Sequence, residues 1–249
     1  MRGLLSAVVF ALTALDATVQ AAARMSTARA RGAHLLSVLS AAQEIDVEPK
    51  KVKVELYMES MCPFCSTFLQ GALTKAWEDP IIRDIMEINV IPYGNAHEIP
   101  NPTAADDYGY QCQHGPNECR GNLQMACAKH VLKDSEKWFP YIRCLEIDNP
   151  RDPASAASEC ENILMLPDEE IVAISHCVTS DLGKKLIHEN AVKTMSLKPP
   201  HKYVPWIVVN DKHTDELQAA AQSDLIALVC ELYTGKRPTA CPTNSSYRE

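Results

Sequence analysis

The stretch YMESMCPFCSTFLQGALTKAW, residues 57–77, decides the fold, because two cysteines lie in it at the point where the hydrophobic period changes. Before the pair, VKVELYM (52–58) alternates apolar and polar residues, which predicts a strand. After it, apolar residues recur every three or four positions, which predicts a helix with one buried face. The members of that face are Phe64, Phe68, Leu69, Ala72, Leu73, Ala76 and Trp77. Pro63 suits the first turn of the helix, where a missing N–H costs nothing.

This position predicts a reactive dithiol at Cys62 and Cys65. The unpaired N–H groups and the positive dipole end of a helix N-terminus lower the pKa of a thiol, to about 3.5–7.5 in such motifs. We therefore expect Cys62 to attack a substrate disulfide and Cys65 to release the reduced substrate by attacking Cys62. Phe64 between them offers the thiolate no charge or hydrogen bond, whereas a histidine there would favour an oxidant, so the pair leans toward a reductase.

Two further strands and a terminal helix complete the expected domain. MEINVIPYG (86–94) and YVPWIVVND (203–211) read as strands, DKHTDE as a turn, and QSDLIALVCELYTG (222–235) as a helix that Gly235 closes. Between residues 95 and about 200 the chain is polar, rich in cysteine and helical in pattern, too long for a loop, so we expect a helical insertion with its own small core. A strand followed by CxxC at a helix start is typical of the thioredoxin-like α/β fold, in which a cis-proline loop, here VPW, faces the pair.

The N-terminus predicts entry into the secretory pathway. Arg2 precedes an apolar run, residues 4–15, that is long enough for a signal peptide and too short for a membrane span; an uncleaved anchor is the alternative. We divide the 249 residues into a signal peptide (1–23), a leader or pro-segment (24–50), the thioredoxin-like domain (51–242) and a tail (243–249). No other segment is apolar enough to span a bilayer, so we expect no membrane contact.

Composition narrows the function classes further. Ten cysteines behind a signal peptide indicate an oxidising compartment with disulfides, and Asn244 begins the sequon NSS, a candidate glycosylation site. The net charge of −8 argues against a nucleic acid partner. The chain has no nucleotide-binding glycine motif and no second CxxC, so we expect neither a cofactor nor a metal.

A second motif resembles a known family. CQHGPNECRGNLQMAC (112–127) has the form CQHG-x-x-EC-x-x-N-x-x-x-x-C, which resembles the signature of the gamma-interferon-inducible lysosomal thiol reductase family. The resemblance continues in PYGNA (92–96), in PPHKYVPWIVVND (199–211) and in LVCELYTGKRPTACP (228–242), and so covers about residues 52–242.

This resemblance implies a thioredoxin-like fold with a helical insertion, and reduction of protein disulfides at acidic pH in endosomes and lysosomes or after secretion. The family's active-site pair matches Cys62 and Cys65, and its cis-proline matches Pro205. We add Val204, Pro63 and Phe64 as candidate substrate-binding residues. The expected partners are unfolded disulfide-containing proteins and a small-thiol or dithiol reductant.

The remaining cysteines leave alternatives open. We expect them to be structural, because small insertions need covalent staples: Cys112, Cys119, Cys127, Cys144, Cys160, Cys177, Cys230 and Cys241. The last two are expected to pair with each other. Alternatively, Cys112, Cys119 and Cys127 form a second redox site. For His114 two roles are open: it shapes a turn with Gly115, or it contacts the active site. The rival functions are a disulfide oxidase or isomerase, and a secreted binding module whose cysteines are all structural.

Overall fold

A three-stranded sheet lies at the centre of the described residues. The computed structural model describes residues 49–99, 109–148 and 151–242, so the predicted signal peptide, nearly all of the leader and the tail with Asn244 lie outside it. The strand order is β2-β1-β5, with β1 (Val52–Met58) parallel to β2 (Met86–Pro92) and antiparallel to β5 (Trp206–Val209). This arrangement confirms the thioredoxin-like class and the three predicted strands.

The crossover from β1 to β2 is helical but is divided into several pieces, where the sequence predicted one helix. It consists of α2 (Pro63–Phe68), the π-helical turn η1 (Leu69–Leu73), α3 (Thr74–Glu78) and α4 (Pro80–Ile85). The Thr74 hydroxyl donates to the Leu69 carbonyl at 2.6 Å across the widened turn. Asp79 then starts α4, because its carboxylate accepts from the Ile81 and Ile82 N–H groups.

The predicted buried face of this crossover was wrong at one position. Phe68 is buried, whereas Phe64, one turn earlier, is 75% exposed. In the first turn of α2 the buried position is Cys65, which is fully buried, and Phe64 beside it points to solvent. This exposure places an aromatic ring on the surface beside the cysteine pair.

The terminal helix starts earlier than the sequence indicated. Helix α10 runs from Asp215 to Leu232, and the Thr214 hydroxyl caps it by accepting from the Leu217 N–H. Asp224 interrupts it with φ −152° and ψ 87°, and its carboxylate accepts from the Ala227 N–H at 3.0 Å. The predicted helix (222–235) therefore corresponds mainly to the half after the kink, and it ends at Leu232 rather than at the predicted Gly235.

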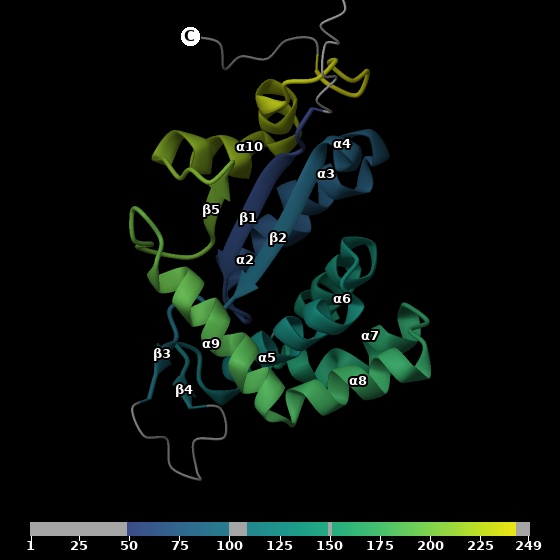
Figure 1. The fold of residues 1–249 in the computed structure, drawn as a ribbon, viewed down its shortest axis with the longest axis vertical. Coiled ribbons are helices and arrows are strands. Elements are labelled where there is room, and N and C mark those ends of the chain that lie inside the picture. The colour runs from purple at the N-terminus through teal and green to yellow at the C-terminus, as the bar shows by residue number, and fades with distance from the viewer. Residues whose placement is uncertain (1–48, 100–108, 149–150, 243–249) are drawn as a thin grey trace, which may run out of the picture. The chain divides into compact units, whose positions relative to one another are not determined.

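The segment between β2 and β5 is a helical insertion, as expected. In Figure 1 its helices gather beyond the ends of β1 and β2 to which the arrowheads point. Its elements are β3 (His97–Glu98), β4 (Tyr110–Gln111), α5 (Pro116–Leu132), α6 (Ser135–Asp148), the 3-10 turn η2 (Pro153–Ala156), α7 (Ala157–Ile163), α8 (Asp168–Val178) and α9 (Asp181–Met195).

The insertion does not have a core of its own, which corrects that part of the expectation. Leu56 of the sheet, Leu123 of α5 and Ile142 of α6 belong to one continuous cluster of buried side chains. The rings of Trp77 and Phe139 meet at 5.1 Å between centroids and join the crossover to α6. The insertion is therefore packed against the sheet and its crossover through one shared core.

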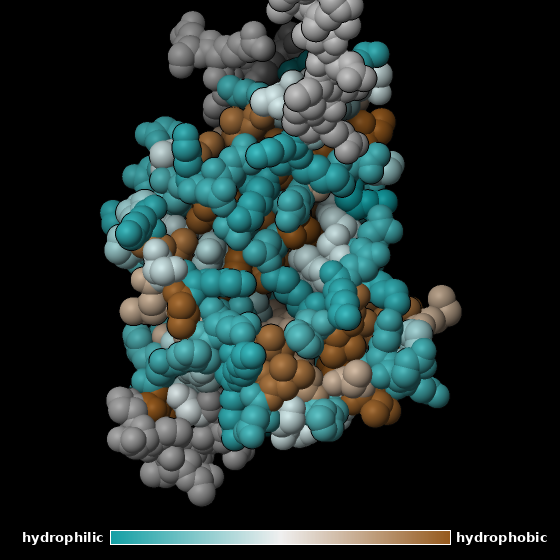
Figure 2. All heavy atoms as spheres, in the orientation of Figure 1, coloured by the Kyte–Doolittle hydropathy of each residue, from teal (hydrophilic) through white to brown (hydrophobic). Residues whose placement is uncertain are grey.

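The face of the molecule drawn in Figure 2 is mainly polar. On the face in Figure 2, hydrophilic side chains predominate and hydrophobic ones form small interspersed groups. Within the described residues, no helix combines the length and the apolar character needed to cross a bilayer.

Candidate active site

Cys62 and Cys65 lie where the chain passes from β1 into α2. β1 ends at Met58, Met61 adopts φ +66°, and Cys62 then caps α2. The Cys62 sulfur accepts from the Cys65 backbone N–H at 3.4 Å. Of the described cysteines, only these two are outside disulfides.

The surroundings of Cys62 favour its thiolate. Its pKa falls from 9.0 to about 7, because the Cys65 thiol hydrogen-bonds to it and the backbone N–H groups of Cys65 and Phe64 add to this effect. Burial and the charge of Glu59 act in the opposite direction. Cys62 is therefore suited to be the nucleophile.

Cys65 has the opposite character. It is fully buried, and burial raises its pKa well above 9.0; its hydrogen bond to Cys62 acts in the same direction. The two thiols are thus differentiated by their surroundings, one as an attacking thiolate and the other as a protonated thiol held in reserve.

A cis-proline loop lies against Cys62. The Val204–Pro205 peptide bond is cis, and the Val204 carbonyl accepts from the Cys62 thiol at 3.8 Å. Gln218 of α10 fixes this loop, since its amide donates to the Pro205 carbonyl at 3.0 Å and accepts from the Ile207 N–H at 2.8 Å. The structure therefore brings Val204 and Pro205 to the pair, where the sequence placed them.

The rim of the site is apolar and accessible. Pro63 and Phe64 are exposed, whereas Cys62 beside them is only 5% exposed. On the cis-proline loop, Tyr203 is 42% exposed and packs edge-on against the Trp206 ring. These exposed side chains can contact a polypeptide that reaches the sulfur.

The sixteen-residue motif of the insertion holds the turn that precedes Cys62. The Ser60 N–H donates to the Asn122 side chain at 2.8 Å, and the Ser60 hydroxyl donates to the Glu118 carbonyl at 3.1 Å. Gly121 permits this approach, because a Cβ there would come within 2.2 Å of the Ser60 oxygen. The motif contains both partners, Glu118 and Asn122, but its spacing does not show that they contact Ser60.

His114 of the same motif also reaches the active-site turn. Its Nδ1 lies 2.8 Å from Glu118 Oε2 and 3.6 Å from Glu59 Oε1. Of the two readings of His114, the structure supports contact with the active-site region; Gly115 beside it has φ +86° and begins α5. Within the described residues, one group of side chains has potential ligand atoms close enough together to hold a metal ion. Its members are Glu59, His114 and Glu118.

Glu146 of α6 is a site residue that the sequence did not reveal. Its side chain is buried, and no described donor reaches either carboxylate oxygen with hydrogen-bond geometry. Burial raises its pKa to about 8, the Met61 N–H opposes this rise, and the charge of Cys62 adds to it. The carboxyl group therefore faces the active-site turn from the insertion, although CLEID looks like an ordinary helical stretch.

The other eight cysteines form four disulfides. Within the insertion the bonds are Cys112–Cys119, Cys127–Cys177 and Cys144–Cys160. Cys230 of α10 is bonded to Cys241 beyond the helix. All eight are thus engaged in bonds, and Cys62 and Cys65 remain as the available thiols.

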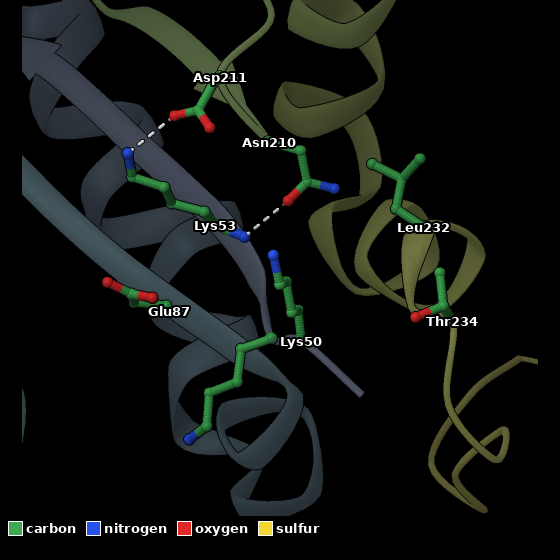
Figure 3. A pocket seen from close by; sticks show the side chains of 8 residues that line it. Lys50, Lys53, Glu87, Asn210, Asp211, Leu232 and Thr234 are labelled. Atoms are coloured by element: carbon green, nitrogen blue, oxygen red, sulfur yellow. Dashed lines mark hydrogen bonds and ion pairs between the residues drawn. The ribbon is translucent and has the colours of Figure 1, made fainter. Parts of the chain in front are cut away.

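An open pocket of about 550 Å³ lies away from this chemistry. Figure 3 shows Lys50 and Lys53 among the residues that line it. The Lys53 ammonium donates to the Asp211 carboxylate at 2.9 Å, and the Lys53 backbone N–H donates to the Asn210 side chain. These residues lie where β1 begins, whereas Cys62 follows the end of β1. The pocket therefore takes no part in the dithiol site.

Comparisons with protein families, with other proteins and with solved structures each find similar chains. The family described as "Gamma interferon inducible lysosomal thiol reductase (GILT)" matches residues 53–164. A goldfish (Carassius auratus) protein named gamma-interferon-inducible lysosomal thiol reductase is 43% identical over 204 residues, covering 82% of this chain and 76% of that protein. The mouse (Mus musculus) protein of the same name is 37% identical over 191 residues, with coverages of 76% and 71%. A solved DsbA structure from Chlamydia trachomatis aligns at a TM-score of 0.45 and 13% identity, covering 69% of this chain and 85% of that one.

Proposed function

This chain belongs to the gamma-interferon-inducible lysosomal thiol reductase family, and from that premise we propose that it reduces protein disulfides through Cys62 and Cys65 at acidic pH. The observation that carries the proposal is the differentiated pair at the start of α2, in which the pKa of Cys62 is lowered and that of Cys65 is raised.

The reaction proceeds by two exchanges. The Cys62 thiolate attacks a substrate disulfide, forms a mixed disulfide and releases one substrate thiolate, which takes up a proton. Cys65 then loses its proton and attacks the Cys62 sulfur, which gives the Cys62–Cys65 disulfide and releases the second substrate thiol. The substrate gains two electrons and the pair loses two, so a small thiol or a dithiol protein must reduce the pair again.

The lowered pKa of Cys62 supports activity in an acidic compartment. At pH 5 a thiol of pKa about 7 is ionised to about 1%, whereas one of pKa 9.0 is ionised to about 0.01%. The surroundings therefore supply roughly a hundredfold more nucleophile at that pH.

The shape of the site favours unfolded substrates. The Cys62 sulfur is recessed, while Phe64 and Tyr203 are exposed around it. A flexible chain can place a disulfide between these apolar side chains, whereas a folded protein keeps its structural disulfides covered.

We place the enzyme in the secretory pathway, in lysosomes or endosomes or outside the cell. The relatives are named as lysosomal, and the four disulfides of the described residues suit an oxidising route.

The test is reduction of a denatured, disulfide-bonded protein at pH 4.5 and pH 7, with wild type beside Cys62→Ser. We expect activity at pH 4.5 that Cys62→Ser abolishes. Activity confined to neutral pH would refute the acidic part of the proposal. A redox potential in the range of known oxidants, from equilibration with thiol buffers, would instead support an oxidase or isomerase.

A further inference from the structure

Two buried carboxylates and one imidazole form a cluster beside the turn that leads to Cys62. The side chains of Glu59 and Glu118 are 1% and 0% exposed, and that of His114 is 32% exposed. Each residue contributes one potential ligand atom, and these three atoms lie within 4.8 Å of one another. We call Glu59, His114 and Glu118 the acid–imidazole cluster. Neither exchange of the proposed reaction uses these side chains.

The negative charge of the cluster lacks a matching positive charge. Within the described part of the chain, both carboxylates form ion pairs with His114, and no lysine or arginine forms one with either of them. Glu118 Oε1 is buried and has no hydrogen-bond partner among the described residues. Buried carboxylates are normally paired with a cation or coordinate a metal ion, because an unpaired charge is costly away from water. Two carboxylates with a neutral imidazole match the charge of one divalent cation.

Three segments that are far apart in the sequence build the cluster. Glu59 follows β1, whereas His114 precedes α5 and Glu118 lies in the first turn of that helix. Gly94, beyond β2, packs so closely on Glu59 that a Cβ there would come within 2.2 Å of Glu59 Oε2. The lack of a second CxxC argued against a metal, but spacing along the chain does not reveal carboxylate and imidazole ligands that come from separate segments.

Backbone groups hold both carboxylates in place. The Asn95 N–H donates to Glu59 Oε2 at 2.7 Å, while Glu59 Oε1 lies 3.6 Å from His114 Nδ1. The His114 N–H donates to Glu118 Oε2 at 2.6 Å, which leaves Glu118 Oε1 without a described partner. Hydrogen bonds of this kind orient ligating carboxylates in metal sites. Each carboxylate therefore retains an oxygen that can bind an ion.

The distances between the ligand atoms fit a small transition-metal ion. Ligands placed tetrahedrally around zinc at about 2.0–2.1 Å lie roughly 3.3 Å from one another. His114 Nδ1 lies 3.6 Å from Glu59 Oε1 and 2.8 Å from Glu118 Oε2, so one distance is above this value and the other below it. The shorter distance is that of a hydrogen bond, and an entering ion displaces the proton from it, because metal ligands must be deprotonated.

We propose that the acid–imidazole cluster binds one divalent transition-metal ion, of which zinc is the representative. The ligands are carboxylate oxygens of Glu59 and Glu118 together with Nδ1 of His114. The exposed side of the imidazole leaves a fourth position for water. Calcium and magnesium fit less well, because they take about six or more oxygen ligands and the cluster offers three protein ligands, one of them a nitrogen.

The bound ion joins two parts of the chain. It connects the turn after β1 to the start of α5, and so adds to the hydrogen bonds that Ser60 makes with Asn122 and with the Glu118 carbonyl. The turn that carries Cys62 is thereby stabilised. This inference is independent of the proposed function, because no step of the thiol exchange uses the ion.

The test is isothermal titration calorimetry with zinc chloride at pH 7. The protein is the full chain with Cys62→Ser/Cys65→Ser and its four structural disulfides intact, because a free dithiol would itself bind zinc. We expect one ion per chain. His114→Asn and Glu118→Gln, each made in this background, should weaken binding by about a hundredfold or more, since even an outer-shell partner is worth about 10–100-fold in affinity.

Two control variants separate the cluster from other places where zinc could bind. Glu161→Gln changes a buried carboxyl on α7, outside the cluster. His188→Asn removes an imidazole that pairs with Glu98 on the surface, where the two side chains are 57% and 48% exposed. Both variants should bind zinc as their parent does. Because His114 is partly exposed, His114→Asn keeps the test valid if Glu118→Gln does not fold.

Thermal unfolding gives a second readout. An ion that binds the folded chain raises the melting temperature as its concentration rises. We therefore expect zinc to raise the melting temperature of the double-serine parent but not that of His114→Asn in the same background.

Three outcomes would overturn the inference. They are no zinc binding by the folded parent, binding that persists in both His114→Asn and Glu118→Gln, and binding that His188→Asn removes, which would assign the ion to the surface pair. The measurement uses protein without active-site thiols, so its failure leaves the reductase proposal intact. Absence of disulfide reduction by wild type would instead refute that proposal alone.

Discussion

The buried carboxyl of Glu146 predicts a protein that is more stable in acid than at neutral pH. Burial raises its pKa from 4.5 to about 8, and Glu118 behaves similarly, with burial raising its pKa to about 7. Between the ordinary and the raised values the folded chain holds a proton that the unfolded chain has released. The stabilisation is therefore fully present below pH 4.5 and is lost as the pH rises through the folded pKa.

The size of the effect follows from the two pKa values. One pKa unit corresponds to about 1.4 kcal/mol, so Glu146 alone should lower the free energy of unfolding by about 3 kcal/mol between pH 5 and pH 8. For a domain of this size, 1 kcal/mol shifts the melting temperature by about 2–4 °C, so we expect a fall of roughly 6–12 °C.

The assay is thermal and urea unfolding of Cys62→Ser/Cys65→Ser protein with its structural disulfides intact, so that the active-site thiols do not titrate. Glu146→Gln mimics the protonated carboxyl and should remove the part of this pH dependence that Glu146 contributes, mainly by raising stability at pH 8. The matched control is Glu136→Gln, because Glu136 lies on the same helix with its side chain 63% exposed. Equal loss of stability in Glu146→Gln and in its parent between pH 5 and pH 8 would contradict the raised pKa of Glu146.

Three further predictions concern the pair and its rim. Alkylation of Cys62 by iodoacetamide should follow a midpoint near pH 7, and Cys65→Ala should move this midpoint upward because the strongest stabilising hydrogen bond is lost; an unmoved midpoint would contradict this assignment. Phe64→Ala should raise KM for unfolded protein substrates while leaving Cys62 alkylation unchanged, and an unchanged KM would remove Phe64 from the substrate surface. Gly121→Ala should lower the melting temperature and slow alkylation of Cys62, since its Cβ would displace Ser60; wild-type values for both would show that this contact is dispensable.

The sequence predicted the features that depend on neighbouring residues alone. The strand of residues 52–58, the helix start at Cys62 and the cis-proline loop before Trp206 follow from alternation, from Pro63 and from the CxxC position. Phe64 was misassigned because a spacing of three and four also fits the neighbouring Cys65, which occupies the buried face of the first turn instead.

The contacts of the site depend on long-range packing and could not be predicted. Ser60 meets Asn122 across 62 residues of sequence, and Glu146 reaches the active-site turn only because α6 packs beyond the sheet. The bond between Cys230 and Cys241 was predicted, but the pairing of the six insertion cysteines depends on the same packing, as the bond between Cys127 and Cys177 joins α5 to α8. Residue spacing alone left these partners open.

Trapping the intermediate of the proposed exchange tests the role of Cys62 as the nucleophile most directly. Cys65→Ser protein is incubated at pH 4.5 with a denatured, disulfide-bonded protein, quenched with acid, and analysed by non-reducing gel and mass spectrometry. We expect a covalent adduct between Cys62 and a substrate cysteine that dithiothreitol releases and that Cys62→Ser/Cys65→Ser protein does not form. Absence of the adduct from folded protein with a free Cys62 thiol, or an adduct through any other cysteine, would contradict it.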